Sequence, residues 1–276
     1  MDKCLYLFNI KNLNNKLIKN KKESDLMKNR IGEKNYNTHG ELMEIVEYRS
    51  AIDITVKFES TNELVKCVYG SFKSGEVKSH LTPTVHGFGI IGFETIRDEN
   101  NNMLESYNCW RGMIHRCYYK KYLDKKPTYE KCTVCEEWKY YSNFKKWFDD
   151  NYYVIGNEKM TLDKDILCKG NKEYSPNTCV FVPERINLLF TKRQNDRGEY
   201  PIGVSEYKST NRLRARCNNG YGKTINLGYF YDEIEAFNVY KDFKEKVIKQ
   251  IADDYKDKIP DNLYEALYKY EVEITD

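Results

Sequence analysis

The sequence predicts a multidomain α+β protein with an N-terminal small β domain, a central strand–turn–strand–helix module with preceding helices, and a C-terminal three-stranded sheet packed on a long helix. Two patterns predict this class. Segments whose apolar residues alternate with a period of two, bounded by glycines, indicate strands, and segments with apolar spacings of three and four indicate helices. The patterns change several times in 276 residues, which is typical of two or three small domains.

Composition narrows the class of protein. Hydrophobic residues make up 40% and aromatic residues 14% of the chain, which is enough for packed cores. We find no run of about 18 apolar residues and no secretory signal pattern, so we expect no membrane span and no membrane partner. Nine dispersed cysteines favour a reducing, cytoplasmic compartment. A net charge of +3 does not identify a nucleic-acid partner, so basic residues must be judged locally.

The N-terminal third predicts two parts. Residues 1–35 read as a flexible basic segment that can touch a DNA backbone, with Met1 or Met27 as alternative starts. Residues 36–96 read as a small domain of about four strands, in which Ile52–Phe58 and Val65–Phe72 alternate apolar and polar residues. The sequence does not reveal the function of this domain, and either DNA or a host protein is a candidate partner.

The central region, residues 105–193, begins with helices and ends with a hairpin. Apolar residues share one face of a helix from Tyr107, and a second helix is predicted from about Glu136 to Phe148. A strand at Thr161–Leu167, a turn at Gly170–Lys172, a return strand at Thr178–Val182 and a helix at Glu184–Lys192 follow.

This last unit suits a one-metal phosphodiester site. A carboxylate on the first strand and an amide oxygen on the helix can hold a hard divalent ion that keeps several waters, and the ion stabilises charge on the scissile phosphate. Asp163 is the strand carboxylate. Asp165 lies two residues further on and is expected on the same face of the strand, as a substitute ligand or base.

The order of motifs resembles phage His-Asn-His (HNH) homing-type endonucleases, which have a ββα-metal fold. The resemblance covers roughly residues 107–193 and implies a metal-dependent DNA endonuclease or nickase that uses Mg²⁺ or Mn²⁺. It implies that Asp163 and Asn187 are the metal ligands, and that the middle Asn of the family falls at Asn177 or Thr178. The motifs are Trp110–Cys117, Cys132–Trp138, Phe144, Leu162–Asp165, Gly170–Lys172, Tyr174–Pro176 and Cys179.

One position departs from the family pattern. Lys164 occupies the place of the general-base His, and a surface Lys is protonated near pH 7 and cannot accept a proton. The departure favours a catalytically degraded HNH scaffold that acts as a DNA- or protein-binding regulatory or counter-defence protein. The alternative for Asp163, Lys164 and Asp165 is a solvated strand edge. His115 is expected to be an ordinary surface residue.

A pair of cysteines in the central region has the spacing of a zinc knuckle. Cys132 and Cys135 are separated by two residues, and Cys117, Cys168 or Cys179 are candidates to complete a structural Zn²⁺ site. The alternative is that these thiols fill a core.

The C-terminal region, residues 198–276, reads as three strands at Ile202–Lys208, Arg212–Cys217 and Lys223–Phe230. A long helix at Asp232–Tyr255 and a short one at Leu263–Tyr270 follow. Arg212, Arg214 and Arg216 alternate and therefore share one face, where they can contact double-stranded DNA, with Lys208 and Lys223 as backbone contacts. The helix is expected to cover the other face through Ile234, Phe237, Tyr240, Phe243, Val247 and Ile251.

This region resembles the three-stranded DNA-binding domain of plant ethylene-response factors (Apetala-type), which phage homing nucleases also carry. The resemblance implies double-stranded DNA as the partner. The chain lacks some of the family's Trp and Arg positions, so no base preference follows. The matching residues are Arg197–Gly198, Pro201–Val204, Arg214–Ala215, Leu227–Phe230, Glu235–Phe237 and Tyr240.

Overall fold

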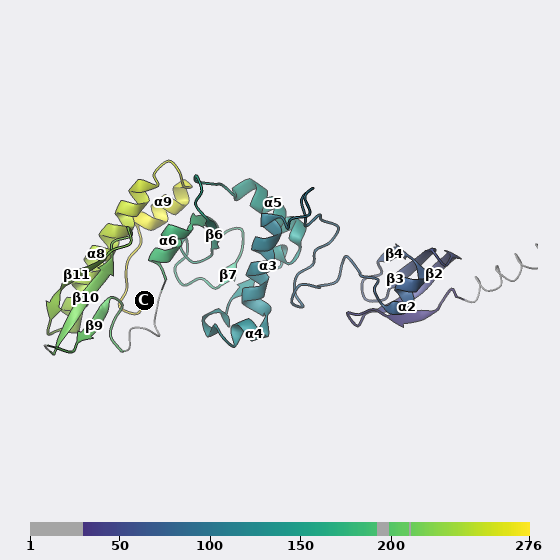
Figure 1. The fold of residues 1–276 in the computed structure, drawn as a ribbon, viewed down its shortest axis with the longest axis horizontal. Coiled ribbons are helices and arrows are strands. Elements are labelled where there is room, and N and C mark those ends of the chain that lie inside the picture. Colours follow the sequence, from purple (N-terminus) through teal and green to yellow (C-terminus); the bar gives the residue numbers. More distant parts are fainter. Residues whose placement is uncertain (1–29, 192–198, 210) are drawn as a thin grey trace, which may run out of the picture. The chain divides into compact units, whose positions relative to one another are not determined.

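The computed structural model describes residues 30–191, 199–209 and 211–276 (Figure 1). The described part contains both helices and strands in several separate sheets, which confirms the predicted α+β multidomain fold. It divides into two compact units. The first unit consists of the described residues within Met1–Asn102 together with Lys139–Ser142, and the second consists of the described residues within Met103–Trp138 and Asn143–Asp276. The predictions for residues up to 29 and for 192–198 lie outside the described residues.

The first unit is built on an antiparallel sheet of four strands. Their order is β1 (Lys34–Tyr36), β2 (Leu42–Ser50), β3 (Asp53–Phe58) and β4 (Leu64–Cys67). Inward-facing residues of β2 and β3 form most of the core, because successive side chains of a strand point to opposite faces. The buried residues are Met43, Ile45, Ile54, Val56, Phe58, Phe72 and Val77.

The predicted strand at Val65–Phe72 is half wrong. The strand β4 ends at Cys67, and the helix α2 (Tyr69–Ser74) follows. This short helix places the fully buried Phe72 against the sheet. Gly75 ends the helix in the left-handed conformation, with a φ of 73°, and its N–H bonds back to the Phe72 and Ser71 carbonyls. A short alternating pattern such as Val65–Phe72 is therefore compatible with a strand or with a helix.

The second unit begins with helices around an aromatic core. The helix α3 (Glu105–Tyr118) matches the prediction, and the short helices α4 (Lys120–Leu123) and η1 (Pro127–Tyr129) follow it. The predicted helix from Glu136 is a 3-10 turn, η2 (Glu137–Lys139), and then α5 (Tyr141–Asn151). The buried Trp138 lies 5.0 Å from Phe144 between ring centroids, so the turn lets this large ring enter the core.

A hairpin and a short helix come next. The strands β6 (Met160–Asp163) and β8 (Val180–Pro183) are antiparallel, and α6 (Glu184–Leu189) packs on both. Two further short strands, β5 (Thr133–Val134) and β7 (Glu173–Tyr174), pair in parallel and connect the hairpin loop to the segment after α3. The predicted ββα order is therefore present, although β6 is shorter than expected.

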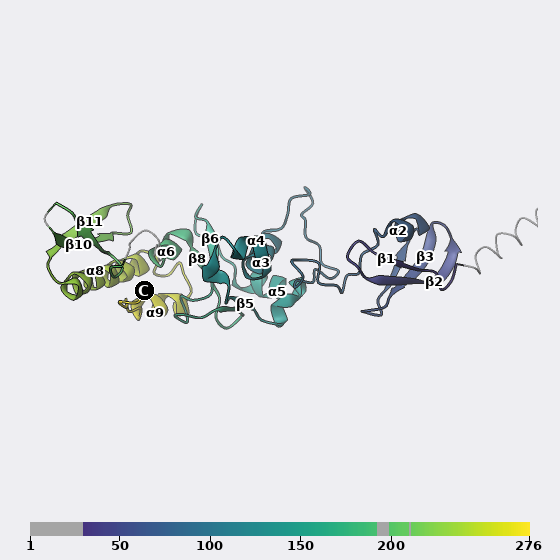
Figure 2. The ribbon, with the colours of Figure 1, turned by 90° about the horizontal axis from the view of Figure 1, so that it is seen from below.

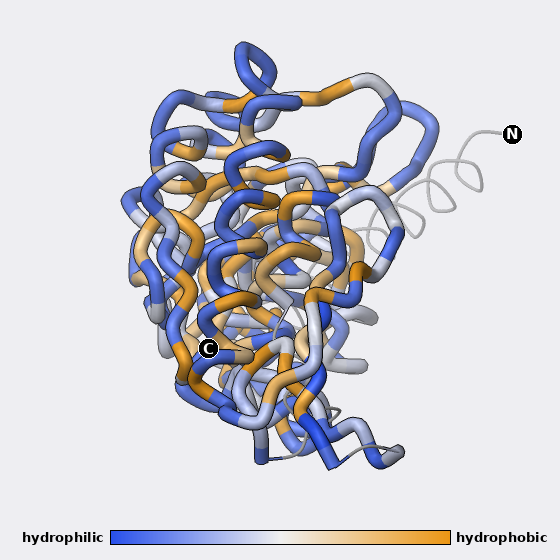
Figure 3. Tube along the Cα trace, turned by 90° about the vertical axis from the view of Figure 1, so that its left-hand side faces the viewer, coloured by the Kyte–Doolittle hydropathy of each residue, from blue (hydrophilic) through white to orange (hydrophobic). Residues whose placement is uncertain are grey.

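The last part is a three-stranded antiparallel sheet covered by a helix. The strands β9 (Val204–Tyr207), β10 (Arg212–Asn218) and β11 (Thr224–Phe230) place β10 in the centre. The helix α8 (Glu233–Asp254) packs on all three strands, and Figures 1 and 2 both show it against β10 and β11. The side chain of Asp232 caps α8 by accepting the Glu235 N–H at 2.8 Å. Figure 3 shows hydrophobic and hydrophilic residues interleaved along the chain trace.

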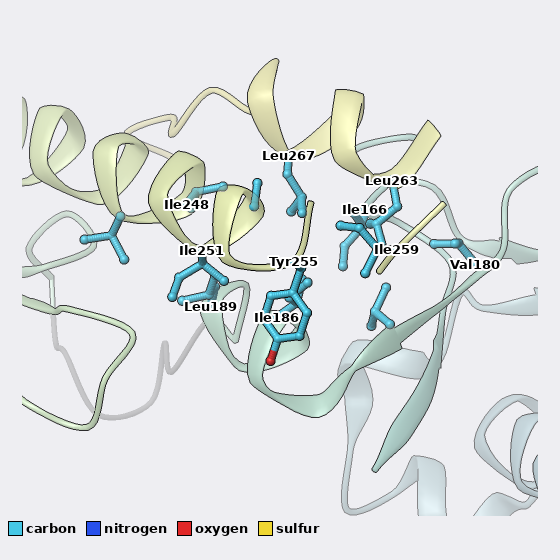
Figure 4. Packing of buried hydrophobic residues seen from close by; sticks show 13 residues of the cluster. Ile166, Val180, Ile186, Leu189, Ile248, Ile251, Tyr255, Ile259, Leu263 and Leu267 are labelled. Carbon is cyan, nitrogen blue, oxygen red and sulfur yellow. The ribbon is translucent and has the colours of Figure 1, made fainter. Parts of the chain in front are cut away.

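The helix α8 serves two cores rather than one. Its first half packs on the sheet through Ala236, Phe237 and Tyr240. Its second half packs on β8, α6 and the last helix α9 (Asp261–Tyr268). Figure 4 shows residues of α8 directed toward Ile186 and Leu189 of α6. The expected apolar face is therefore corrected, because Ile234 is exposed and Val247 and Ile251 lie in the second cluster.

No helix in the described ranges is long and apolar enough to cross a membrane.

Candidate nucleic-acid interface and nuclease-like hairpin

The free face of the C-terminal sheet is basic. Along β10, Arg212, Arg214 and Arg216 alternate with residues that point into the core, of which Ala215 and Cys217 are buried. The core residues pack toward α8. The three arginines therefore share the face that α8 leaves uncovered, as their spacing predicts.

Two tyrosines on the neighbouring strands complete this face. In the sheet register Arg212 lies opposite Tyr207 of β9, and Arg214 lies opposite Tyr229 of β11. Directly paired residues of antiparallel strands point to the same face. We call the set Arg212, Arg214, Arg216, Tyr207 and Tyr229 the basic sheet face.

Aromatic rings hold two of these guanidinium groups. The Arg214 guanidinium carbon lies 5.2 Å from the centroid of the Tyr207 ring, which itself lies 4.8 Å from the Tyr229 ring. The Arg212 guanidinium carbon lies 4.8 Å from the Tyr231 ring. Stacking on an aromatic face restricts an arginine side chain without neutralising its charge. The rings therefore preorganise cations that remain available to a ligand.

The basic sheet face has little internal compensation. Within the described residues, no carboxylate lies within ion-pair distance of Arg212, Arg214 or Arg216. The Nε atom of Arg214 is also buried without a hydrogen-bond partner, as is the Oγ atom of Ser205, which lies directly opposite it on β9. Buried polar atoms in folded proteins usually have partners, so these two neighbouring atoms are exceptions.

The two predicted backbone contacts lie beside this face. Lys208 directly follows β9, and Lys223 directly precedes β11, and both side chains are exposed. No pattern in the sequence pointed to Tyr207 and Tyr229, because their approach to the arginines depends on which strands pair.

At the hairpin, Asp163 ends β6. Its Oδ1 atom accepts the backbone N–H groups of Asp165, at 2.9 Å, and of Ile166, at 2.8 Å. Burial, together with the smaller effect of the negative charge of Asp165, raises the pKa of Asp163 to about 6, against the opposing effects of these hydrogen bonds and of Lys164. Because Oδ1 of Asp163 already accepts two hydrogen bonds, Oδ2 is the oxygen of this carboxylate that is better placed to bind a cation.

The structure corrects two expectations about the neighbours of Asp163. Asp165 does not share a strand face with Asp163, because the N–H bonds to Asp163 turn the chain at the end of β6. Lys164 is not a surface residue but is 7% exposed, and its Nζ lies 3.4 Å from Oδ2 of Asp165. A buried, ion-paired Lys164 does not supply a general base.

The remaining site residues lie on separate segments. Asn177 is exposed in the loop before β8, whereas the Thr178 hydroxyl donates to the Glu173 carbonyl at 2.9 Å and therefore has a structural role. Asn187 is half-buried on α6. Within the described residues, no three His, Cys, Asp or Glu side chains group as a metal site. Asp163 ends β6, and Asn187 lies on α6, which packs on β6.

The cysteines are mostly core residues. Cys117, Cys132 and Cys179 are buried, Cys135 is half-buried and Cys168 is exposed. Burial raises the pKa of Cys117 and of Cys179 to about 12, so both thiols are neutral in the metal-free protein. Zinc binding at Cys132 and Cys135 stays a prediction.

His115 is half-buried rather than a plain surface residue. Its ring lies 4.8 Å from the Tyr119 ring and 4.9 Å from the Tyr122 ring.

No protein-family model matches the chain, and comparisons with curated proteins and with solved structures give no match. The two family resemblances therefore rest on the sequence motifs alone.

Proposed function

We propose that this protein binds double-stranded DNA through the basic sheet face. The observation that carries the proposal is the row of three arginines on one strand, without carboxylate partners in the described ranges and flanked by tyrosine rings. A β-sheet can place a strand in the major groove of DNA, where arginine pairs with guanine or with phosphate. The resemblance to ethylene-response-factor domains favours the same partner.

The test is a set of three variants, Arg212→Gln, Arg214→Gln and Arg216→Gln, in the full chain. Binding to a random-sequence duplex is measured by fluorescence anisotropy over a series of salt concentrations. For each phosphate that a variant no longer neutralises, the log–log salt slope should fall by about 0.9. Removing an arginine that pairs bidentately with a base should cost about 1–3 kcal/mol on a specific site.

Lys249→Gln serves as the matched control, because Lys249 is an exposed cation on α8, which covers the opposite side of the sheet. It should change neither affinity nor slope. The proposal fails if the wild-type chain does not bind duplex DNA at low salt, or if the three arginine variants behave like Lys249→Gln.

A second candidate function is metal-dependent cleavage of DNA at the hairpin. Asp163, at the end of β6, and Asn187, on the helix that packs on β6 and β8, support it. A bound Mg²⁺ or Mn²⁺ would stabilise charge on the scissile phosphate. Asp163 would hold the ion through Oδ2, and Asn187 through its amide oxygen. The burial and ion pairing of Lys164 favour the alternative of a binding scaffold without a base.

Plasmid cleavage in Mg²⁺ or Mn²⁺ separates these alternatives. For an enzyme, Asp163→Asn and Asn187→Ala abolish cleavage while DNA affinity is retained. For a degraded scaffold, the wild-type chain does not cut, and Lys164→His introduces nicking. If neither the wild-type chain nor Lys164→His cuts in either metal, the hairpin has no catalytic role.

A further inference from the structure

Two cationic side chains lie close to the ring of Tyr174 in β7. None of these residues belongs to the basic sheet face. The Nε atom of Arg116, on α3, donates to the Tyr174 hydroxyl at 3.1 Å, and its guanidinium carbon lies 5.4 Å from the ring centroid. Lys164, from the turn after β6, places its Nζ atom 5.7 Å from the same centroid. Two segments that are 48 residues apart thus bring positive charges to one ring. We call Arg116, Lys164 and Tyr174 the buried cation cluster.

The charge of this cluster is only partly compensated. Lys164 has one ion-pair partner, Asp165, whose side chain is 45% exposed. Within the described residues, Arg116 has no carboxylate within ion-pair distance, and its one hydrogen bond uses Nε. The two terminal amino groups of the guanidinium are therefore left without an acceptor. Lys164 is buried and Arg116 is half-buried, and a charge withdrawn from water is costly unless it is paired, so the cluster favours an anionic ligand.

An exposed basic segment adjoins the cluster. Residues 119–131, which include α4 and η1, carry five exposed lysines and only two acidic residues. None of these lysines has an ion-pair partner in the described part of the chain. Burial raises the pKa of Tyr129 in η1, and the nearby positive charges of Arg116 and Lys164 act in the opposite direction. The segment therefore lies close to the cluster. The lysines are Lys120, Lys121, Lys125, Lys126 and Lys131.

We propose that the buried cation cluster binds a backbone phosphate of DNA, and that the lysines of residues 119–131 guide the backbone to it. The ligand rests on the proposed DNA-binding function. A phosphodiester carries one negative charge, and arginine binds phosphate oxygens through two parallel N–H bonds, for which the free amino groups of Arg116 are suited. Lys164 adds a second cation. Lys164 directly follows Asp163 in the chain, so the bound phosphate lies beside the end of the strand β6.

The first arm of the test uses inorganic phosphate and the full chain without DNA. The melting temperature is measured as phosphate replaces chloride at constant ionic strength in the low millimolar range. A ligand that binds only the folded state raises the melting temperature. We expect a rise for the wild-type chain and its loss in Arg116→Gln and Lys164→Met.

Arg111→Gln is the matched control, because Arg111 is an exposed arginine on the same helix α3. It should keep the wild-type rise, whereas any small rise that remains in Arg116→Gln measures the general stabilisation by phosphate as a strongly hydrated ion. The anion site is overturned if the wild-type rise is absent, or if it persists in Lys164→Met, whose linear apolar side chain suits the buried position.

The second arm measures DNA binding and does not depend on the folding of the buried variants. Lys120→Gln, Lys121→Gln, Lys125→Gln and Lys126→Gln are combined in one chain, and all four positions are exposed. The log–log salt slope should fall by up to about 0.9 for each phosphate that these lysines neutralise in the wild-type complex. An unchanged slope overturns the role of the segment.

The two arms also separate this inference from the proposed function. If the wild-type chain binds DNA through the basic sheet face but shows neither the phosphate effect nor the change in slope, the inference fails and the function stands. If the wild-type chain does not bind DNA, the function fails and the DNA ligand fails with it. A phosphate effect that Arg116→Gln abolishes would then leave an anion site for another phosphoryl compound.

Discussion

The Nε atom of Arg185, on α6, donates a hydrogen bond to the backbone carbonyl oxygen of Gly220, 3.0 Å away in the turn between β10 and β11. The same guanidinium lies 3.4 Å from Asp254 and stacks on Tyr221, with 4.5 Å between its carbon and the ring centroid. One side chain thus joins the hairpin region to the C-terminal sheet. The two regions with different family resemblances also share the apolar cluster of Figure 4.

Arg185→Ala should lower the free energy of unfolding by about 1–3 kcal/mol, because it removes a charge-assisted hydrogen bond to a half-buried turn. Urea unfolding measures this effect. Lys159→Ala is the control, since Lys159 forms an ion pair with Glu184 on the same helix but is 71% exposed. An exposed pair contributes at most about 1 kcal/mol, so the two variants should differ. Equal effects would mean that Arg185 does not link the two regions.

Gly203→Ala should destabilise the C-terminal sheet. Gly203 has a φ of 81°, and a Cβ atom there would overlap the ring of the buried Tyr240 on α8. We expect a loss of about 2 kcal/mol or more, from backbone strain and overpacking together. Gly222→Ala separates the two causes, because Gly222 has a φ of 83° with open space around its Cβ position. Thermal unfolding of both variants gives the comparison, and a loss no greater than that of Gly222→Ala would contradict the steric effect.

Lys244→Met should stabilise the protein at neutral pH. Lys244 is buried on α8, and within the described residues no carboxylate pairs with it. Burial lowers the pKa of Lys244, although Cys217 acts in the opposite direction. A lowered lysine pKa means that folding opposes the charged form, and this penalty is largest below the folded pKa and falls as pH rises.

The expected gain for Lys244→Met is on the order of 1 kcal/mol at pH 7, with a smaller gain near pH 10. Chemical denaturation at the two pH values checks it. Lys249→Met, at an exposed position on the same helix, should change stability little. A destabilised Lys244→Met chain would show that the ammonium group has a partner that the fold requires.

Acid should selectively weaken the first unit through Glu63. Burial opposes the charged carboxylate, but hydrogen bonds from Ser79 and His80 outweigh it and hold the pKa of Glu63 below its usual 4.5. Because the folded pKa is the lower one, the stabilisation is fully present above pH 4.5 and is lost as pH falls through the folded value.

Glu63→Gln should therefore cost on the order of 1 kcal/mol at pH 7 and much less at pH 3. Unfolding of the two chains at both pH values, followed by hydrogen exchange of amides in β3 and β4, tests this. Glu59→Gln, at an exposed position near the end of β3, is the control. A pH-independent difference between Glu63→Gln and the wild-type chain would contradict the carboxylate's role.

Much of the fold was predictable because its signals are local. The alternation of arginines along β10 and the apolar period of α8 depend only on the geometry of a single strand or helix. The predicted start of α8 is also confirmed, and the side chain of Asp232 caps the helix there. Short elements were harder. The stretch Val65–Phe72 became a strand and a helix, because a few alternating residues do not separate the two periods.

The sequence by itself determined that Arg212, Arg214 and Arg216 share one face and that Asp163 lies on the first strand of a hairpin followed by a helix, whereas the structure ends that strand at Asp163. Only the tertiary structure decided that Lys164 is buried beside Tyr174, that Tyr207 lies over Arg214, and that the second half of α8 packs on α6. The physical reason is the range of the contacts. Strand alternation and helical period are fixed by neighbouring residues, whereas the burial of a charge depends on segments that meet only when the chain has folded.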